Sequence, residues 1–121
     1  MIPTMSTVVI VDDSELFRRS ARGLLELDGY EVIGEAADGA EALELVPRLR
    51  PDAVLLDIGL PDASGLDVAE RLAPASSRIV LVSSRDSSDF GARISRSGVA
   101  GFISKDELSG AQLARLLGGA S

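Results

Sequence analysis

Five short segments rich in apolar and β-branched residues recur along the chain, and segments with helical periodicity separate them. Short apolar runs beside turn residues are typical of strands that are buried on both faces of a sheet. Strands that alternate with helices predict parallel strands joined by right-handed crossovers, with helices over both faces of the sheet. The sequence therefore predicts a doubly wound α/β fold. The predicted strands are 7–11, 30–37, 53–57, 79–82 and 101–104.

The predicted helices differ in how firmly the sequence supports them. In the first, Asp13 or Ser14 caps the start and Asp28 stands at the end. Pro47 lies inside the second pattern and predicts a kink or an early end there. The segment 86–97 has few apolar residues, so we expect a weakly held helix. The apolar faces of the first, second, third and last helices contain Phe17, Ala21, Leu24 and Leu25; Ala42, Leu45, Val46 and Leu49; Leu66, Val68, Ala69 and Leu72; and Leu108, Leu113, Leu116 and Leu117.

Composition excludes several kinds of chemistry. The chain has 121 residues with no cysteine and no histidine, so thiolate sites, disulfides, histidine-ligated zinc and Ser-His-Asp catalysis cannot arise from this chain alone. The net charge of −7 argues against direct binding of nucleic acid or an anionic membrane. No apolar stretch approaches the ~20 residues of a membrane span, and no signal-peptide pattern begins the chain. We expect one cytoplasmic domain over 1–121, with 118–121 either a linker start or a frayed tail.

Polar side chains stand at the ends of four predicted strands. The carboxyl ends of parallel strands meet at one edge, where ligands and chemistry collect in open α/β sheets. Taken singly, each residue has an ordinary explanation as a helix cap, a turn residue or a solvated charge. Their complementary chemistry nevertheless predicts a common site. The residues are Asp12 and Asp13, Asp57, Ser83 and Lys105.

Three carboxylates held close together need compensation. At ~4 Å and an effective dielectric constant near 20, each like-charge pair costs roughly 4 kcal/mol. Either one carboxylate takes up a proton or a cation neutralises the group. Oxygen ligands alone favour a hard ion such as Mg²⁺, or Mn²⁺ in its place. Together with the cation of Lys105 and the hydroxyl of Ser83, such an ion would suit phosphoryl transfer to Asp57.

Four stretches of the chain resemble the receiver domains of two-component response regulators. They are 11–14, 55–61 with Gly65 downstream, 81–84 and 101–105, in the family's order and spacing. The residues at 16–18 and 105–107 are most similar to those of receivers that precede a helix-turn-helix DNA-binding domain. The resemblance implies a flavodoxin-like (βα)5 sandwich with strand order 2-1-3-4-5.

The same resemblance implies a role for each acidic residue. Asp57 would accept a phosphoryl group from a sensor histidine kinase or a phosphotransfer protein. Asp13 would bind Mg²⁺ directly and Asp12 chiefly through water. Asp57 and the backbone carbonyl of Gly59 would complete the protein's ligands. Such a domain is not an enzyme, although it assists its own phosphorylation and dephosphorylation.

The resemblance further implies a conformational switch. Ser83 and Lys105 would contact the phosphoryl group, and Phe102 would turn inward as the loop at Ser83 closes. The surface formed by the fourth and fifth strand-helix units would then change, with a homodimer as one result. Transcription is the implied output, through an effector domain outside these residues or a partner protein. Asp106 replaces the proline often found there, so we expect no cis peptide bond after Lys105.

Two other functions remain open from the sequence. A degenerate receiver would act as a phosphorylation-independent protein-binding module, and it could dispense with the acidic residues and the lysine. A flavodoxin-like binder of flavin or nucleotide would use a glycine-rich phosphate loop. The first strand leads instead into Asp12-Asp13, and neither GxGxxG nor GxxxxGK[ST] occurs.

Overall fold

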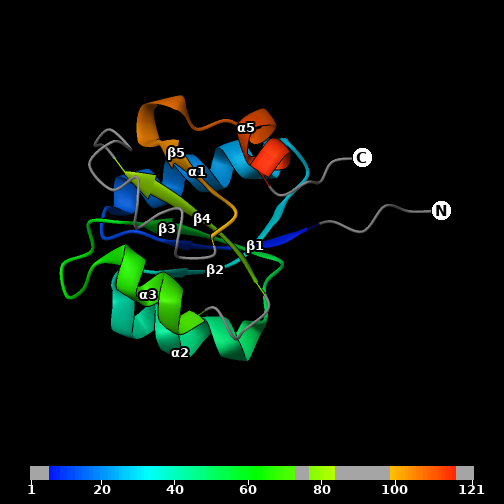
Figure 1. Ribbon diagram of the computed structural model, residues 1–121. Coiled ribbons are helices and arrows are strands. Elements are labelled where there is room, and N and C mark those ends of the chain that lie inside the picture. Colours follow the sequence, from blue (N-terminus) through cyan, green and yellow to red (C-terminus); the bar gives the residue numbers. More distant parts are fainter. Residues whose placement is uncertain (1–5, 73–76, 84–98, 117–121) are drawn as a thin grey trace.

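Five parallel strands form one sheet in the order β2-β1-β3-β4-β5, as Figure 1 shows in a computed structural model that describes residues 6–72, 77–83 and 99–116. This architecture confirms the predicted doubly wound fold and its strand order. Each observed strand lies within one residue of its predicted bounds. The strands are β1 Thr7–Val11, β2 Glu31–Ala36, β3 Ala53–Asp57, β4 Arg78–Ser83 and β5 Gly101–Ser104.

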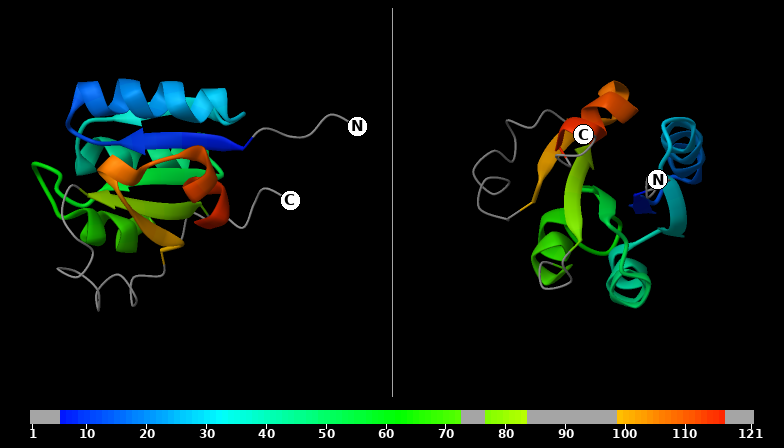
Figure 2. Two further views of the ribbon diagram at one scale, coloured as in Figure 1. Left: turned by 90° about the horizontal axis from the view of Figure 1, so that it is seen from above. Right: turned by 90° about the vertical axis from the view of Figure 1, so that its right-hand side faces the viewer.

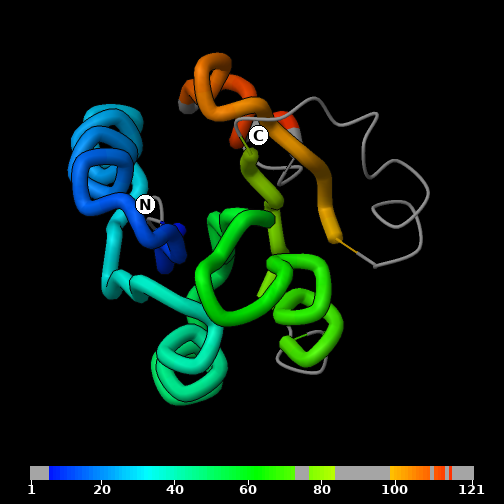
Figure 3. The backbone as a smooth tube through the Cα atoms, turned by 90° about the vertical axis from the view of Figure 1, so that its left-hand side faces the viewer, coloured from blue at the N-terminus to red at the C-terminus, as the bar shows by residue number. Residues whose placement is uncertain are grey.

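Helices cover both faces of this sheet. In Figures 1 and 2, α1 (Glu15–Leu27) and α5 (Gly110–Leu116) lie over one face, while α2 (Gly39–Leu49) and α3 (Gly65–Leu72) lie over the other. Figure 3 shows the same two layers seen along the sheet. A short 3₁₀ turn, η3 (Lys105–Glu107), precedes α5. The helix predicted at 86–97 lies outside the described residues, and no helix that is described is long and apolar enough to cross a membrane.

The hydrophobic core is divided in two by the sheet. Successive side chains of a strand point to opposite faces, so each buried strand contributes to both halves. Val9, Val54 and Leu56 pack in the half between the sheet and helices α2 and α3. Ile10 and Leu55 pack in the half between the sheet and helices α1 and α5. The central strands are therefore apolar throughout, and their polar residues stand only at the ends.

The last helix begins later than predicted, and of the two alternatives for the second helix, a kink or an early end at Pro47, the early end is excluded. The α2 helix does not stop early at Pro47 but runs on to Leu49, and Arg50 ends it with a left-handed φ of 51°. Pro47 is exposed in the last turn, so its missing N–H leaves the carbonyl of Leu43 without its helical bond, and the helix nevertheless continues for two residues. Leu108 was expected on the last helix, yet it caps η3 ahead of α5 while still packing against the core. Ser14, one of the two predicted caps of α1, accepts a hydrogen bond from the Phe17 N–H at 3.1 Å.

The loop after β3 folds back tightly on the end of that strand. The N–H of Gly65 donates to the carbonyl of Ile58 at 2.8 Å. A Cβ atom on Gly65 would lie 2.2 Å from the carbonyl oxygen of Asp57. Further along, the carboxylate of Asp62 accepts hydrogen bonds from Gly39 N at 2.8 Å and Ala40 N at 3.0 Å, which anchors the loop to the start of α2. The loop that follows Asp57 is thereby attached both to the end of β3 and to the start of α2.

We expect Gly65→Ala to destabilise the protein by about 3 kcal/mol, because the added methyl group overlaps backbone that cannot move independently. Gly23→Ala is the matched control, since a Cβ there meets nothing within 4 Å in the middle of α1. Alanine at that exposed helical site should stabilise the protein by about 1 kcal/mol. Urea unfolding of both variants measures the difference, and similar stabilities for the two would contradict the close approach at Gly65.

Candidate functional site

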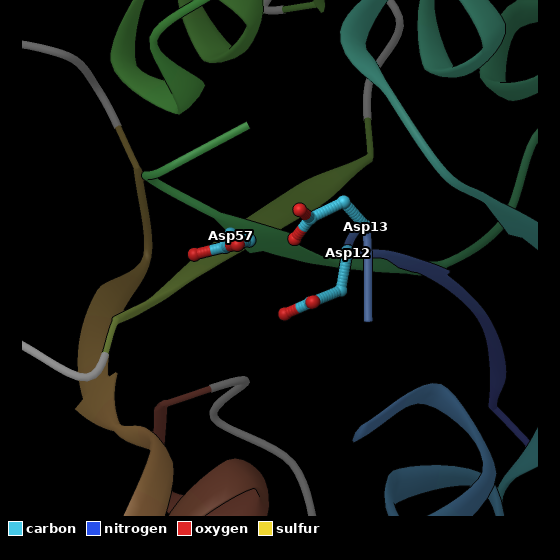
Figure 4. A group of neighbouring side chains, drawn as sticks. All are labelled: Asp12, Asp13 and Asp57. Carbon is cyan, nitrogen blue, oxygen red and sulfur yellow. The ribbon is translucent and has the colours of Figure 1, made fainter. Parts of the chain in front are cut away.

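Three carboxylates meet at the carboxyl edge of the sheet. Asp12 and Asp13 directly follow β1, and Asp57 is the last residue of β3. One oxygen from each lies within 4.8 Å of the others. Figure 4 shows the three side chains extending beyond the strand ends toward the same side. The structure therefore brings together the acidic residues that the sequence predicted to converge.

Asp12 is completely buried, with 0% of its surface exposed. Its Oδ1 accepts a hydrogen bond from Ser14 N at 2.8 Å, and its own N–H donates to the carbonyl of Ala36 at 3.0 Å. Its Oδ2 lies 2.6 Å from Nζ of Lys105, but this ion pair lacks the geometry of a hydrogen bond. Among the described residues nothing else bonds to Oδ2, so a buried carboxylate oxygen is left without a hydrogen bond.

Asp57 is 5% exposed, and its carboxylate experiences both attractive and repulsive charges. Burial, the largest influence, raises its pKa above the ordinary value. The Gly59 N–H, which donates to Oδ1 at 3.1 Å, and the cation of Lys105 oppose that rise. The negative charges of Asp12 and Asp13 add to it. The net direction of the pKa is upward, so ionising Asp57 costs more here than it does in water.

Lys105 is the cation of this site. Its Nζ lies 2.6 Å from Asp12 Oδ2 and 3.6 Å from Asp57 Oδ2, reaching from the end of β5. The same nitrogen lies 4.6 Å from the centre of the Phe17 ring, a cation–π distance. The sequence pattern had placed Phe17 only on the core face of α1. No sequence signal related it to a lysine that is 88 positions away, because that contact depends on how α1 and β5 pack.

The remaining predicted site residues lie at the end of β4, on β5 and in the loop after β3. Ser83 ends β4, the strand beside β3, and is 5% exposed. Gly59 is exposed two residues after Asp57. Phe102 on β5 is partly buried against the half of the core below α2 and α3. Among the described residues there is no cis peptide bond, which agrees with the expectation for Lys105-Asp106.

A second charged group, formed by Arg18, Arg22 and Glu35, contacts the backbone of Asp12. The sequence patterns did not predict it. Nη1 of Arg18 donates to the backbone carbonyl of Asp12 at 2.6 Å, and its Nε donates to Glu35 Oε1 at 3.0 Å. Nε of Arg22 donates to the other oxygen of Glu35 at 2.8 Å. Burial alone would raise the pKa of Glu35, but hydrogen bonds and charge from Arg22 and Arg18 outweigh it and hold the pKa below the usual value. The four-residue spacing of Arg18 and Arg22 places both side chains on one face of α1. The sequence does not show that Glu35 lies beside that face, because this contact depends on the pairing of β2 with β1.

The acidic group fits a hard divalent cation. Its side-chain donors are all carboxylate oxygens, and one of them is buried without a hydrogen bond. Lys105 supplies one positive charge against three carboxylates. Mg²⁺ and Mn²⁺ prefer oxygen ligands of this kind and retain water where the protein offers few. The residues present therefore match the predicted metal.

We expect Asp57→Asn to stabilise the metal-free protein at neutral pH. A group with a raised pKa in the folded state contributes stability below its unfolded pKa and loses it as the pH rises through the folded pKa. The gain from asparagine should therefore be present at pH 7 and disappear below about pH 4. Thermal unfolding in chelator across this range measures it. A loss of stability at pH 7 would contradict the balance of charges described above.

Comparison with known proteins identifies the family. The model of the response regulator receiver domain matches residues 8–117. The nitrate/nitrite response regulator protein NarP of Escherichia coli is 42% identical over 82% of this chain and 47% of its own length. BvgA of Bordetella pertussis, named as a transcription regulator of virulence factors, is 38% identical over 83% of this chain and 49% of its own. This chain thus spans about half the length of these curated relatives.

A solved structure agrees with this assignment. The signal receiver domain of NarL from Mycobacterium tuberculosis superposes with a TM-score of 0.88 at 33% identity, covering 98% of this chain and 100% of that one. Family, fold and the acidic group at the sheet edge point to the same class of signalling domain. The chain belongs to the response regulator receiver domains of two-component signal transduction.

Proposed function

We propose that Asp57 is the phosphoacceptor of this receiver domain. The observation that carries the proposal is a nearly buried carboxylate at a strand end, with a lysine cation 3.6 Å away and two further carboxylates beside it. An oxygen of Asp57 attacks the phosphorus of a phosphohistidine on a partner kinase or phosphotransfer protein. The bond between phosphorus and the histidine nitrogen breaks, and an aspartyl phosphate forms.

The surrounding residues hold the reacting groups in place. The Gly59 N–H fixes Oδ1 of Asp57, while Oδ2 faces Lys105. Asp13, Asp57 and the carbonyl of Gly59 would hold Mg²⁺ or Mn²⁺, with Asp12 acting chiefly through water. When bound, the ion would offset the negative charge of the carboxylates and the incoming phosphoryl oxygens. This self-assistance in phosphorylation and dephosphorylation belongs to a signalling domain and not to an enzyme with a separate substrate.

Lys105 and Ser83 would receive the transferred group. The Lys105 ammonium would pair with one phosphoryl oxygen and the Ser83 hydroxyl would donate to another. Ser83 ends β4 directly opposite Ser104, two residues from Phe102 on β5. A movement at Ser83 would therefore reach Phe102 through neighbouring strands. Phosphorylation would shift the balance between two conformations of the surface formed by β4, β5 and the segments that follow them.

Transcription is the output that the relatives favour. BvgA is named as a transcription regulator, and this chain matches about half of that protein. We propose that residues 1–121 form a cytoplasmic receiver domain that acts through an effector domain or a partner protein, with dimerisation on phosphorylation as one route. A sensor histidine kinase is the proposed donor. The net charge of −7 favours protein contacts over direct contact with nucleic acid for these residues.

Phosphorylation by a small-molecule phosphodonor in Mg²⁺ provides the test. We expect mass spectrometry to detect one added phosphoryl group, sensitive to hydroxylamine, on the wild-type protein and none on Asp57→Asn. Asp52→Asn is the matched control, because Asp52 lies just before β3 at the opposite end of the same strand. That variant should be labelled like the wild type.

Undiminished labelling of Asp57→Asn would overturn the assignment of Asp57. Titration of Mg²⁺ by calorimetry adds an independent measurement. Absence of binding at millimolar Mg²⁺, together with absence of labelling, would favour a binding module that does not depend on phosphorylation.

A further inference from the structure

We propose that Arg18, held by Glu35, is a positioning residue for the pair Asp12 and Asp13, a role that rests on the proposed metal-binding function of that pair. Arg18 lies on α1, outside the group of residues that would touch the metal or the phosphoryl group. Its guanidinium nevertheless reaches the backbone between the two carboxylates. It would act on the site through that backbone and not by direct contact.

The contact falls on the peptide unit that joins the two acidic residues. Nη1 of Arg18 donates to the carbonyl oxygen of Asp12 at 2.6 Å. The direction of that carbonyl sets the plane of the Asp12–Asp13 peptide and hence the position of the Asp13 Cα. In the part of the chain that the structure describes, no hydrogen bond or ion pair holds the exposed Asp13 carboxylate itself. The backbone is therefore what places this carboxylate.

Arg18 is itself held firmly. Its Nε lies 3.0 Å from Glu35 Oε1, with only 16% of the Arg18 side chain exposed. The second oxygen of Glu35 lies 2.8 Å from Nη2 of Arg22, so two arginines from consecutive turns of α1 bind one carboxylate. Partial burial makes such pairs less sensitive to screening than surface ion pairs. The planar guanidinium donates to the carboxylate and to the carbonyl from nitrogens held in a fixed fork, a geometry that the compact ammonium group of lysine does not reproduce.

Other contacts maintain the fold at this point without Arg18. The Asp12 N–H donates to Ala36 O at 3.0 Å and the β1–β2 pairing continues up to Val11. Arg18 is therefore added to a backbone that β2 already holds, and its effect falls on the residue that follows. Mutation of a residue that orients a metal ligand without touching the metal typically lowers metal affinity by about 10–100-fold.

Mg²⁺ titration by calorimetry of the 121-residue chain tests this role. Arg18→Lys keeps the positive charge but loses the two-way contact, and Glu35→Gln removes the charged anchor of Arg18. We expect each to raise the dissociation constant for Mg²⁺ by about tenfold. Arg19→Lys is the matched control, because Arg19 is adjacent on α1, its side chain is 77% exposed, and within the described residues its ion pair is with Glu15 one turn away. Its Mg²⁺ affinity should equal that of the wild type.

Phosphorylation by a small-molecule donor at increasing Mg²⁺ separates positioning from general damage. In Arg18→Lys the Mg²⁺ concentration for half-maximal rate should rise by the same factor, while the rate at saturating Mg²⁺ returns to the wild-type value. Mg²⁺ affinity equal to that of Arg19→Lys would overturn the proposal, whether or not the melting temperature falls. A wild-type protein that neither binds Mg²⁺ nor becomes labelled would overturn the proposed function and this role with it.

Discussion

Mutual repulsion among the three carboxylates is the constraint on which the functional end of this structure depends. Asp12, Asp13 and Asp57 offer oxygens within 4.8 Å of one another, and two of these residues are buried. Lys105 offsets part of that charge through an ion pair at 2.6 Å and a longer one at 3.6 Å. Burial and the neighbouring charges still leave the pKa of Asp57 raised. A site held in this state gains from any cation or protonation that relieves it, which is why it suits a metal-assisted reaction.

The scaffold resists that repulsion because backbone contacts hold the segments that carry the acidic residues. The loop after β3 returns to its own strand at Gly65, so close to the backbone of Asp57 that no side chain fits at position 65. On the other side, the ends of β1 and β2 hold Asp12, and Arg18 secures the peptide that leads to Asp13. Rigid strands therefore supply the precision, and charged contacts from α1 refine it.

Much of the fold was predictable because local pattern and global architecture agree. The run 53–56 is apolar at every position and ends at Asp57, as expected of a strand covered on both faces. Two boundaries differ from what the sequence allowed: α2 does not take the early end that was one alternative at Pro47, and Leu108 precedes α5. Both lie near helix ends, where small differences in hydrogen bonding decide the boundary. The acidic group was equally predictable, since parallel strands must end at one edge.

The sequence by itself determined the alternation of strands and helices, the polar residues at the strand ends and the oxygen-only chemistry of the site. Tertiary structure alone decided which distant groups support those residues. Phe17 meets Lys105 because α1 and β5 share one half of the core, and Glu35 meets Arg18 because β2 pairs with β1. Periodicity reports the face on which a residue lies, but not its partner across the core. Those contacts depend on packing, which couples segments that no local pattern relates.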